Sequence, residues 1–317
     1  MSKSHSTSAS PANRCAWKGI FVELATPFHE DERLDLKSLV AQAEFVAETG
    51  ADGIVVCSRH GEADKLSIEE RLRVAATVLE KLKQRTPVLV DVCAPSNYLS
   101  VELAKHAKDH GAAGILASPR LETTFTDSQV QIYFDELDAA VGLPVMVLDT
   151  PPASTVTLSS HLIANLFPEI GSVVAVKVEA RPTSTKINAI ARLEPSLAIF
   201  AAHHGARAAD ELSRGARGII CSAALSTPSQ QVESAFRTGD LEGALRANSQ
   251  CAELVGYLEQ SEDFAHHCAK RLLHCMGVLD TSVVRRPTCP FDERNERELL
   301  RIAGECGAIP GGKTARG

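Results

Sequence analysis

Apolar and polar positions alternate along this chain in two different periods. Short runs rich in Val, Ile, Leu and Ala are separated by longer stretches in which apolar residues recur every three or four positions. The runs are typical of buried strands, and the longer stretches are typical of amphipathic helices. The predicted strands are 19–25, 53–57, 88–92, 114–117, 145–148, a run ending at Lys177, 197–201 and 218–221. The predicted helices are 34–49, one opening at Ser67 with Glu70 in capping-box position, 98–110, 128–140, 158–166, 185–193 and 206–214.

Eight strand–helix alternations predict a (β/α)₈ TIM barrel. An internal repeat supports this fold, because Gly50–Val55 recurs as Gly111–Leu116 and as Gly215–Ile220. In each copy we expect the first glycine to end a helix and the second to let the chain turn tightly into a strand. A doubly wound open sheet is the alternative. No glycine-rich phosphate loop follows the first strand, which disfavours that alternative.

The pattern after residue 221 is purely helical, over 228–237, 241–260, 263–276 and part of 292–306. We therefore expect a disordered tail at 1–17, the barrel at 18–224, a C-terminal helical extension at 225–308 packed on the barrel, and a loose tail at 309–317. Helices appended to a closed barrel often build subunit contacts, so we expect a homo-oligomer.

Composition narrows the class of protein. The 317 residues are 44% hydrophobic and carry a formal net charge of −7, which argues against a nucleic-acid or anionic membrane partner. No apolar run approaches membrane-spanning length. Nine cysteines without a repeated spacing do not form a disulfide framework. These features predict a cytoplasmic protein.

Lys177 stands near the end of the predicted sixth strand, which is otherwise apolar. A buried ammonium group is costly unless it is paired or neutralised. A desolvated lysine has a lowered pKa and can attack a carbonyl carbon. Alternatively, the side chain reaches the rim or pairs with Glu179 or Glu23. This stretch alone leaves both interpretations open.

The carboxyl ends of the strands form the active-site face of a TIM barrel. The polar residues expected there are Thr26, Ser58, Arg59, His60, Gly61, Glu62, Arg120, Asp149, Thr150, Lys177, His203, His204 and Ser222. One lysine, two arginines and three histidines on this rim predict a cationic pocket for a small carboxylate. A nearby Arg59 would also disfavour protonation of Lys177.

Several motifs in consistent order, from about Gly19 to Ala308, give the chain a family resemblance. It resembles the dihydrodipicolinate synthase and N-acetylneuraminate lyase family of pyruvate-dependent aldolases and lyases. The residues that carry the resemblance are Thr26-Pro27-Phe28, Gly61-Glu62, Leu66–Arg71, Pro144-Val145-Met146, Thr150-Pro151-Pro152, Lys177, Gly215–Gly218 and Met276-Gly277-Val278.

The resemblance implies a homotetrameric barrel, with a homodimer also open, in which Lys177 forms a Schiff base with a 2-oxo acid, usually pyruvate. The protonated imine would act as an electron sink, without any cofactor. In that family the loop matching Ser58–Glu62 holds the substrate carboxylate.

The chain also departs from the family pattern. The family loop Gly-Thr-Thr-Gly-Glu is here Ser58-Arg59-His60-Gly61-Glu62, and the two family tyrosines fall on Leu148 and Leu121. Leucine can neither transfer a proton nor donate a hydrogen bond. A dihydrodipicolinate synthase proper or a standard sialic-acid lyase is therefore not expected.

Three functions remain open. The first is a lyase or dehydratase in which Lys177 is the nucleophile, His60 transfers protons and Arg59 clamps the carboxylate, with His203 and Asp149 assisting. The second is a protein that binds a small acid without turnover, and the third is other barrel chemistry. The substrate-binding residues expected are Thr26, Ser58, Arg59, Gly61, Asp149, His203 and Ser222.

We expect no metal site. His267, Cys268, His274 and Cys275 gather late in the chain, but each like pair is seven residues apart. On a helix that spacing is about 10 Å, too far for one ion. Cys57, Cys93 and Cys221 are expected to be small buried residues.

Overall fold

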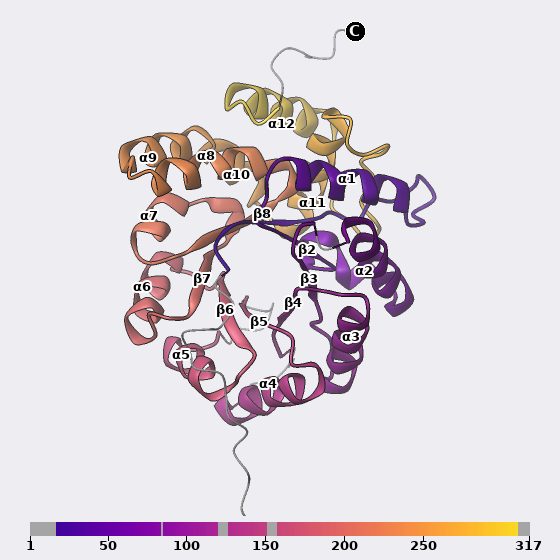
Figure 1. Ribbon diagram of the computed structural model, residues 1–317. Helices are drawn as coiled ribbons and strands as arrows, with labels where there is room; N and C mark the ends of the chain where they lie inside the picture. Colours follow the sequence, from indigo (N-terminus) through magenta and orange to yellow (C-terminus); the bar gives the residue numbers. More distant parts are fainter. Residues whose placement is uncertain (1–16, 84, 120–125, 151–156, 310–317) are drawn as a thin grey trace, which may run out of the picture.

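The computed structural model describes residues 17–83, 85–119, 126–150 and 157–309. In these residues, eight parallel strands pair in sequence order and β8 pairs back to β1, so the sheet is a closed barrel. Closure confirms the predicted TIM barrel and excludes the open doubly wound sheet (Figure 1). The strands are β1 (Gly19–Glu23), β2 (Gly53–Val56), β3 (Val88–Asp91), β4 (Gly114–Ala117), β5 (Val145–Asp149), β6 (Val173–Val178), β7 (Ala198–Ala201) and β8 (Gly218–Ser222).

A helix follows each strand and packs on the outside of the barrel. The helices within the described ranges are α1 (Leu36–Glu48), α2 (Ile68–Leu82), α3 (Asn97–Asp109), α4 (Asp127–Val141), α5 (Ser160–Glu169), α6 (Thr183–Leu193), α7 (Ala208–Ser213), α8 (Ser226–Arg237), α9 (Leu241–Gln250), α10 (Ala252–Leu258), α11 (Glu262–Cys275) and α12 (Glu293–Glu305). The capping box of Ser67 and Glu70 is present at the start of α2.

One expectation about the later helices needs correction. The single helix predicted over 241–260 is two helices, because α9 ends and α10 begins at Cys251. Helix α8 packs against β8 and β1, which is the place of the eighth barrel helix. We therefore propose that the helical extension begins after α8, whereas the sequence predicted its start at residue 225. The tails proposed at 1–17 and 309–317 lie almost wholly outside the described residues.

Aromatic side chains fill the interior of the barrel below the carboxyl ends of the strands. Phe21 of β1 contacts Phe200 of β7 edge to face, with 5.0 Å between ring centroids, and Trp17 packs beside Phe21. Because side chains in a strand alternate between faces, residue 23 points to the same side as Phe21. The aromatic layer thus forms the floor on which the polar layer above it rests.

The repeated glycines follow this packing. Gly50, Gly111 and Gly215 have positive φ angles of 82°, 82° and 111°, as expected for glycines that end helices. The second glycine of each repeat was expected to allow a tight turn, but Gly53 and Gly114 have another role. A Cβ at Gly53 would lie 2.3 Å from the Phe21 ring, and one at Gly114 would lie 2.4 Å from Trp17. These glycines make room for the aromatic floor.

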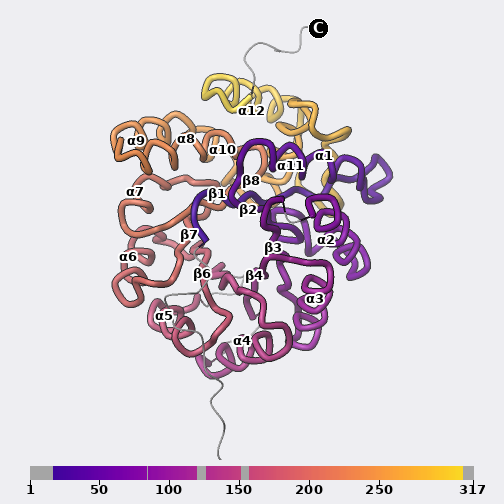
Figure 2. The backbone as a smooth tube through the Cα atoms, in the orientation of Figure 1, coloured from indigo at the N-terminus to yellow at the C-terminus, as the bar shows by residue number. Residues whose placement is uncertain are grey.

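The C-terminal helices cover one side of the barrel and reach its carboxyl face. Helix α11 packs against the 3₁₀ turns η2 (Arg59–Gly61) and η5 (Ala223–Leu225), which follow β2 and β8. Helices α10, α11 and α12 pack against one another, and the ribbon and the tube draw them above the barrel, where the labels α1 and β8 also stand (Figures 1 and 2). The extension is therefore close enough to supply side chains to the active-site face.

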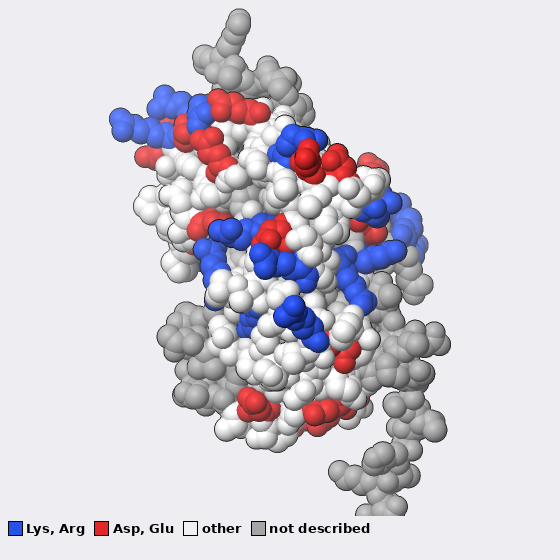
Figure 3. Space-filling model, turned by 90° about the vertical axis from the view of Figure 1, so that its left-hand side faces the viewer, with Lys and Arg blue, Asp and Glu red and all other residues white. Residues whose placement is uncertain are grey.

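None of the helices in the described ranges is both long and apolar enough to cross a bilayer. On the face that carries α6, α7 and α9, several basic and acidic side chains lie next to one another, and basic side chains predominate in a band across the middle (Figure 3).

Candidate active site

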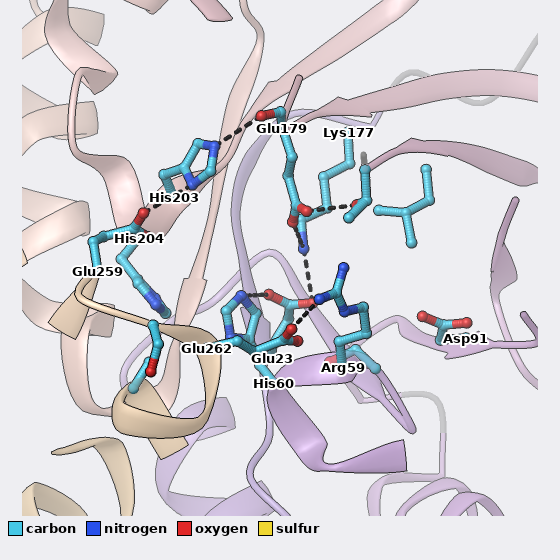
Figure 4. A pocket seen from close by; sticks show the side chains of 15 residues that line it. Glu23, Arg59, His60, Asp91, Lys177, Glu179, His203, His204, Glu259 and Glu262 are labelled. Carbon is cyan, nitrogen blue, oxygen red and sulfur yellow. Dashed lines mark hydrogen bonds and ion pairs between the residues drawn. The ribbon is translucent and has the colours of Figure 1, made fainter. Parts of the chain in front are cut away.

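A cavity of about 190 Å³ opens at the carboxyl ends of the strands, where the sequence analysis placed the site. Figure 4 shows the side chains that converge on it from β1, β3, β6, the turns after β2 and β7, and the segment that enters α11. Its lining residues are Glu23, Ser58, Arg59, His60, Asp91, Leu148, Thr150, Lys177, Glu179, His203, His204, Glu259, Ser261, Glu262 and Ala265.

Lys177 lies at the centre of this layer and is held by two carboxylates. Its Nζ atom is 2.7 Å from Oε1 of Glu179 and 2.9 Å from Oε1 of Glu23 (Figure 4). Its side chain is only 3% exposed. Lys177 and Glu179 are two positions apart at the end of β6, so both point inward. The amine is thus shielded from bulk water and held between two carboxylates.

The lowered pKa that we expected for Lys177 is wrong in the resting protein. Burial alone would lower the pKa of this amine, but the charges of Glu179 and Glu23 outweigh burial and raise its pKa above the ordinary value. Lys177 correspondingly holds the pKa of Glu179 well below its usual range, against the effect of burial. The site therefore contains a charged ammonium between two carboxylates.

His60 lies against the other oxygen of Glu23. Its Nε2 is 3.5 Å from Oε2 of Glu23, and its ring lies 4.7 Å from that of His204. Burial and the charge of Lys177 lower the pKa of His60 to about 3, so the imidazole is neutral at physiological pH. A ring with this pKa accepts a proton poorly. The lowered pKa of His60 therefore argues against its expected role as the proton carrier.

Arg59 is turned toward the C-terminal extension. Its guanidinium pairs with the carboxylate of Glu262, at the start of α11. The largest charge effects on the pKa of Lys177 come from Glu179 and Glu23, and not from Arg59 as we expected. The prediction of a cationic pocket is also wrong, because five carboxylates line the cavity, those of Glu23, Asp91, Glu179, Glu259 and Glu262.

One residue of the loop after β2, Ser58, is placed as expected for binding a carboxylate. The hydroxyl of Ser58 lines the cavity, is buried, and has no hydrogen-bond partner among the described residues. Thr26 and Gly61 hold this loop in place and do not line the cavity: the Thr26 hydroxyl donates to the Gly61 carbonyl oxygen at 2.6 Å. Of these three residues, only Ser58 is placed to meet a ligand.

Asp149 and Ser222 lie outside the main cavity. Asp149 forms an ion pair with Lys186 of α6 at 2.8 Å, and burial raises its pKa to about 6 in spite of that lysine. The Ser222 hydroxyl is buried without a partner among the described residues, and the backbone N–H of Ser222 donates to Nδ1 of His204. Both residues shape the walls behind the site.

His203 lines the cavity at the turn after β7. Its Nδ1 lies 3.1 Å from Glu259, and its Nε2 lies 2.9 Å from the backbone oxygen of Glu179. Burial lowers the pKa of His203, but these two contacts outweigh burial and raise it. Its neighbour His204 is buried, and burial together with His60 lowers its pKa to about 3.

Five of the nine site residues predicted from the sequence line the cavity, namely Ser58, Arg59, His60, Lys177 and His203. Glu23 and Glu179 were named only as possible partners of Lys177, and both pairs are present. They were not predicted as site residues, although their period-two spacing from Phe21 and Lys177 was a usable signal. Glu259 and Glu262 come from the extension, which was expected to pack on the barrel, but no sequence signal placed these two residues at the cavity. Leu148 lines the cavity and is in register with Lys177. Arg120, Leu121, Pro151 and Pro152 lie outside the described residues.

The late His/Cys cluster is dispersed on α11, where Cys268 is buried and Cys275 is exposed. Asp263, His267 and Cys289 do bring three potential ligand atoms within 4.8 Å of one another. However, Asp263 already accepts hydrogen bonds from Lys65 at 2.9 Å and from the Thr288 hydroxyl at 2.9 Å. Each oxygen of this carboxylate thus already has a hydrogen-bond partner within the protein.

Comparisons with known proteins identify the family and agree with the fold. The model of the dihydrodipicolinate synthetase family matches residues 16–305. The chain is 28% identical over 291 residues to N-acetylneuraminate lyase of Escherichia coli, covering 90% of this chain and 96% of that one. It is 27% identical over 299 residues to 4-hydroxy-tetrahydrodipicolinate synthase of Geobacter metallireducens, covering 91% and 98%. Dihydrodipicolinate synthase from Rhodopseudomonas palustris superposes with a TM-score of 0.85 at 25% identity, covering 95% of this chain and all of that one.

Proposed function

The chain belongs to the dihydrodipicolinate synthetase family, and from this premise we propose that it is a Schiff-base-forming lyase that acts on pyruvate or another small 2-oxo acid. The observation that carries the proposal is Lys177, a buried amine of β6 that lines the cavity at the carboxyl ends of the strands. Named relatives of the chain are a lyase and a synthase that extend over nearly its whole length.

The proposed reaction begins with attack of the Lys177 amine on the ketone carbon. Loss of water gives a protonated imine, which draws electrons from the next carbon and allows a bond there to form or break. The Ser58 hydroxyl is the donor that we propose for the substrate carboxylate, because it lines the cavity without a partner among the described residues. Arg59 would add a second contact when it exchanges Glu262 for the substrate.

The second candidate function is binding of a small acid without turnover. Two observations favour it: Lys177 is charged in the resting site, and Leu148 stands beside it where the family resemblance expects a tyrosine. Both functions place the ligand in the same cavity. They differ in whether a covalent bond to Lys177 forms.

Reduction with borohydride in the presence of pyruvate separates the two functions. We expect intact-mass spectrometry to detect one stable adduct, mapped to Lys177 by peptide analysis. The variant Lys177→Ala should give no adduct, whereas Lys105→Ala, which removes an exposed lysine of α3, should react like the unmodified protein. Saturable pyruvate binding without an adduct would instead support the second function.

The assembly and the cellular compartment complete the proposal. A homotetramer or homodimer is the assembly that the family resemblance implies, and the cytoplasm is the compartment that the composition favours. Light scattering of the purified full chain would measure the assembly directly.

A further inference from the structure

Two carboxylates contact the Lys177 amine, and none of the described residues that line the cavity is a tyrosine, so this arrangement points to a different route for protons. We propose that Glu179 is a catalytic residue that carries protons between Lys177 and the substrate. This inference rests on the proposed Schiff-base function. It assigns to a carboxylate on β6 the work for which the sequence resemblance supplies only Leu148.

Contact and exposure single out Glu179 from Glu23. Glu179 makes the shorter contact to Nζ, 2.7 Å against 2.9 Å. Both side chains line the cavity, but that of Glu179 is 14% exposed, whereas that of Glu23 is 2% exposed and lies against His60. A proton carrier must reach both the amine and the incoming carbonyl oxygen. Only Glu179 meets both requirements, and Glu23 serves to position the amine.

The surroundings of Glu179 fix its orientation. Its Oε2 accepts a hydrogen bond from the Thr150 hydroxyl at 2.5 Å, which leaves Oε1 directed at Lys177. His203 binds the backbone oxygen of the same residue at 2.9 Å (Figure 4). A catalytic carboxylate needs support of this kind, because small displacements of a reacting group cost large factors in rate.

The chemistry balances with Glu179 as the only carrier. A proton passes from the ammonium to Glu179, the free amine forms the C–N bond, and the protonated carboxyl returns that proton to the carbonyl oxygen. The nitrogen then gives a second proton to Glu179, which delivers it to the hydroxyl group as water leaves. The amine thus loses two protons, water gains both, and the iminium keeps one. Glu179 ends ionised, free to accept a proton from the carbon next to the imine.

The variant Glu179→Gln tests this role by the rate of imine formation with pyruvate. Aliquots quenched with borohydride at successive times give the initial rate and the final extent of adduct. We expect the rate at neutral pH to fall by about 10²- to 10⁴-fold, the range for loss of a general acid–base, while the same adduct accumulates in the end. Loss of a negative charge by itself favours the free amine and would speed the reaction. A slower rate therefore cannot come from the charge on Lys177.

Two further variants separate catalysis from structure. Glu23→Gln removes the other carboxylate that contacts Nζ, and we expect its rate to change by less than about tenfold. In Glu179→Ala, added formate should restore part of the rate, because a small carboxylate can occupy the space left in the cavity. A rate in Glu179→Gln equal to that of the unmodified protein would overturn the role of Glu179 alone. Absence of any adduct in the unmodified protein would overturn the proposed function, and this inference with it.

Discussion

At the scale of single residues, the charge on Lys177 controls how the site can react. Lys177 can attack a ketone carbon only as the neutral amine, but Glu23 and Glu179 stabilise its protonated form. Transfer of that proton to Glu179 removes the difficulty, because the ammonium–carboxylate pair and the amine–acid pair contain the same number of protons. The reactive form is then reached without exchange with water.

This internal transfer predicts a distinctive pH dependence. The pKa of Glu179 is lowered and that of Lys177 is raised, so the pair holds one proton throughout the neutral range. The rate of borohydride-trapped imine formation should therefore be nearly independent of pH in that range. In Glu179→Gln, the proton must leave to solvent, so the rate should rise about tenfold per pH unit until the pKa of Lys177 is reached. Initial rates over several pH values measure this, and parallel profiles for the two proteins would contradict it.

The residues that sequence reasoning could place are those fixed by one strand alone. Alternation in a strand sends Lys177 inward, and the carboxyl-end rule puts it at the active-site face. The contacts that set its pKa depend on neighbours across the barrel, such as Glu23 on β1. Arg59 was expected to act on Lys177, but Glu262, from a helix more than two hundred positions later, draws it away. Long-range pairs of this kind have no local signature.

At the scale of elements, strand and helix periods predicted the barrel because its contacts are mostly between sequence neighbours. Each strand pairs with the next one along the chain, and the repeated glycines mark equivalent positions. The hydrophobic period could not show why the position of the second glycine in each repeat must be glycine. That reason lies in ring contacts between different strands, such as Phe21 against Gly53.

The aromatic floor makes a testable prediction about stability. In Gly53→Ala, the new Cβ would lie 2.3 Å from the Phe21 ring, which is held by Phe200 and cannot move freely. We expect the free energy of unfolding to fall by about 1–3 kcal/mol, the usual cost of overpacking. Gly304→Ala in α12 is the matched control: nothing lies within 4 Å of its new Cβ, so helix propensity should stabilise it by up to about 1 kcal/mol. Urea denaturation measures both, and equal shifts would contradict the packing argument.

At the scale of the whole molecule, the C-terminal extension is part of the site and not only a cover for the barrel. Glu259, Ser261 and Glu262 line the cavity, and they stand where α10 ends and α11 begins. The break at Cys251 that the sequence pattern missed separates α9 on the outside of the barrel from this segment. The position of α11 against the loop after β2 therefore affects the geometry of Arg59.

A buried ion pair connects α11 to that loop and gives the last prediction. Nζ of Lys270 lies 2.5 Å from Glu62, and both side chains are almost fully buried, with Lys270 over the ring of Phe28. Burial lowers the pKa of Lys270 to about 8, although Glu62 opposes this change. Lys270→Met would leave the Glu62 carboxylate buried without its main partner. We expect a loss of about 3–5 kcal/mol in the free energy of unfolding, as for other buried pairs broken on one side.

The double variant Glu62→Gln with Lys270→Met distinguishes the charge from the packing. Once both charges are removed, no buried ion remains unpaired, so a large part of the lost stability should return. The ionised pair also sets a pH dependence. Because the pKa of Lys270 is lower in the folded chain than the value near 10.4 of a free lysine, the folded state binds fewer protons between about pH 8 and 10. Stability should therefore rise with pH in that window, and Lys270→Met should lose this rise. Urea denaturation of the three proteins at two pH values decides it, and a double variant no more stable than Lys270→Met would show that packing, and not charge, fixes α11 to the site.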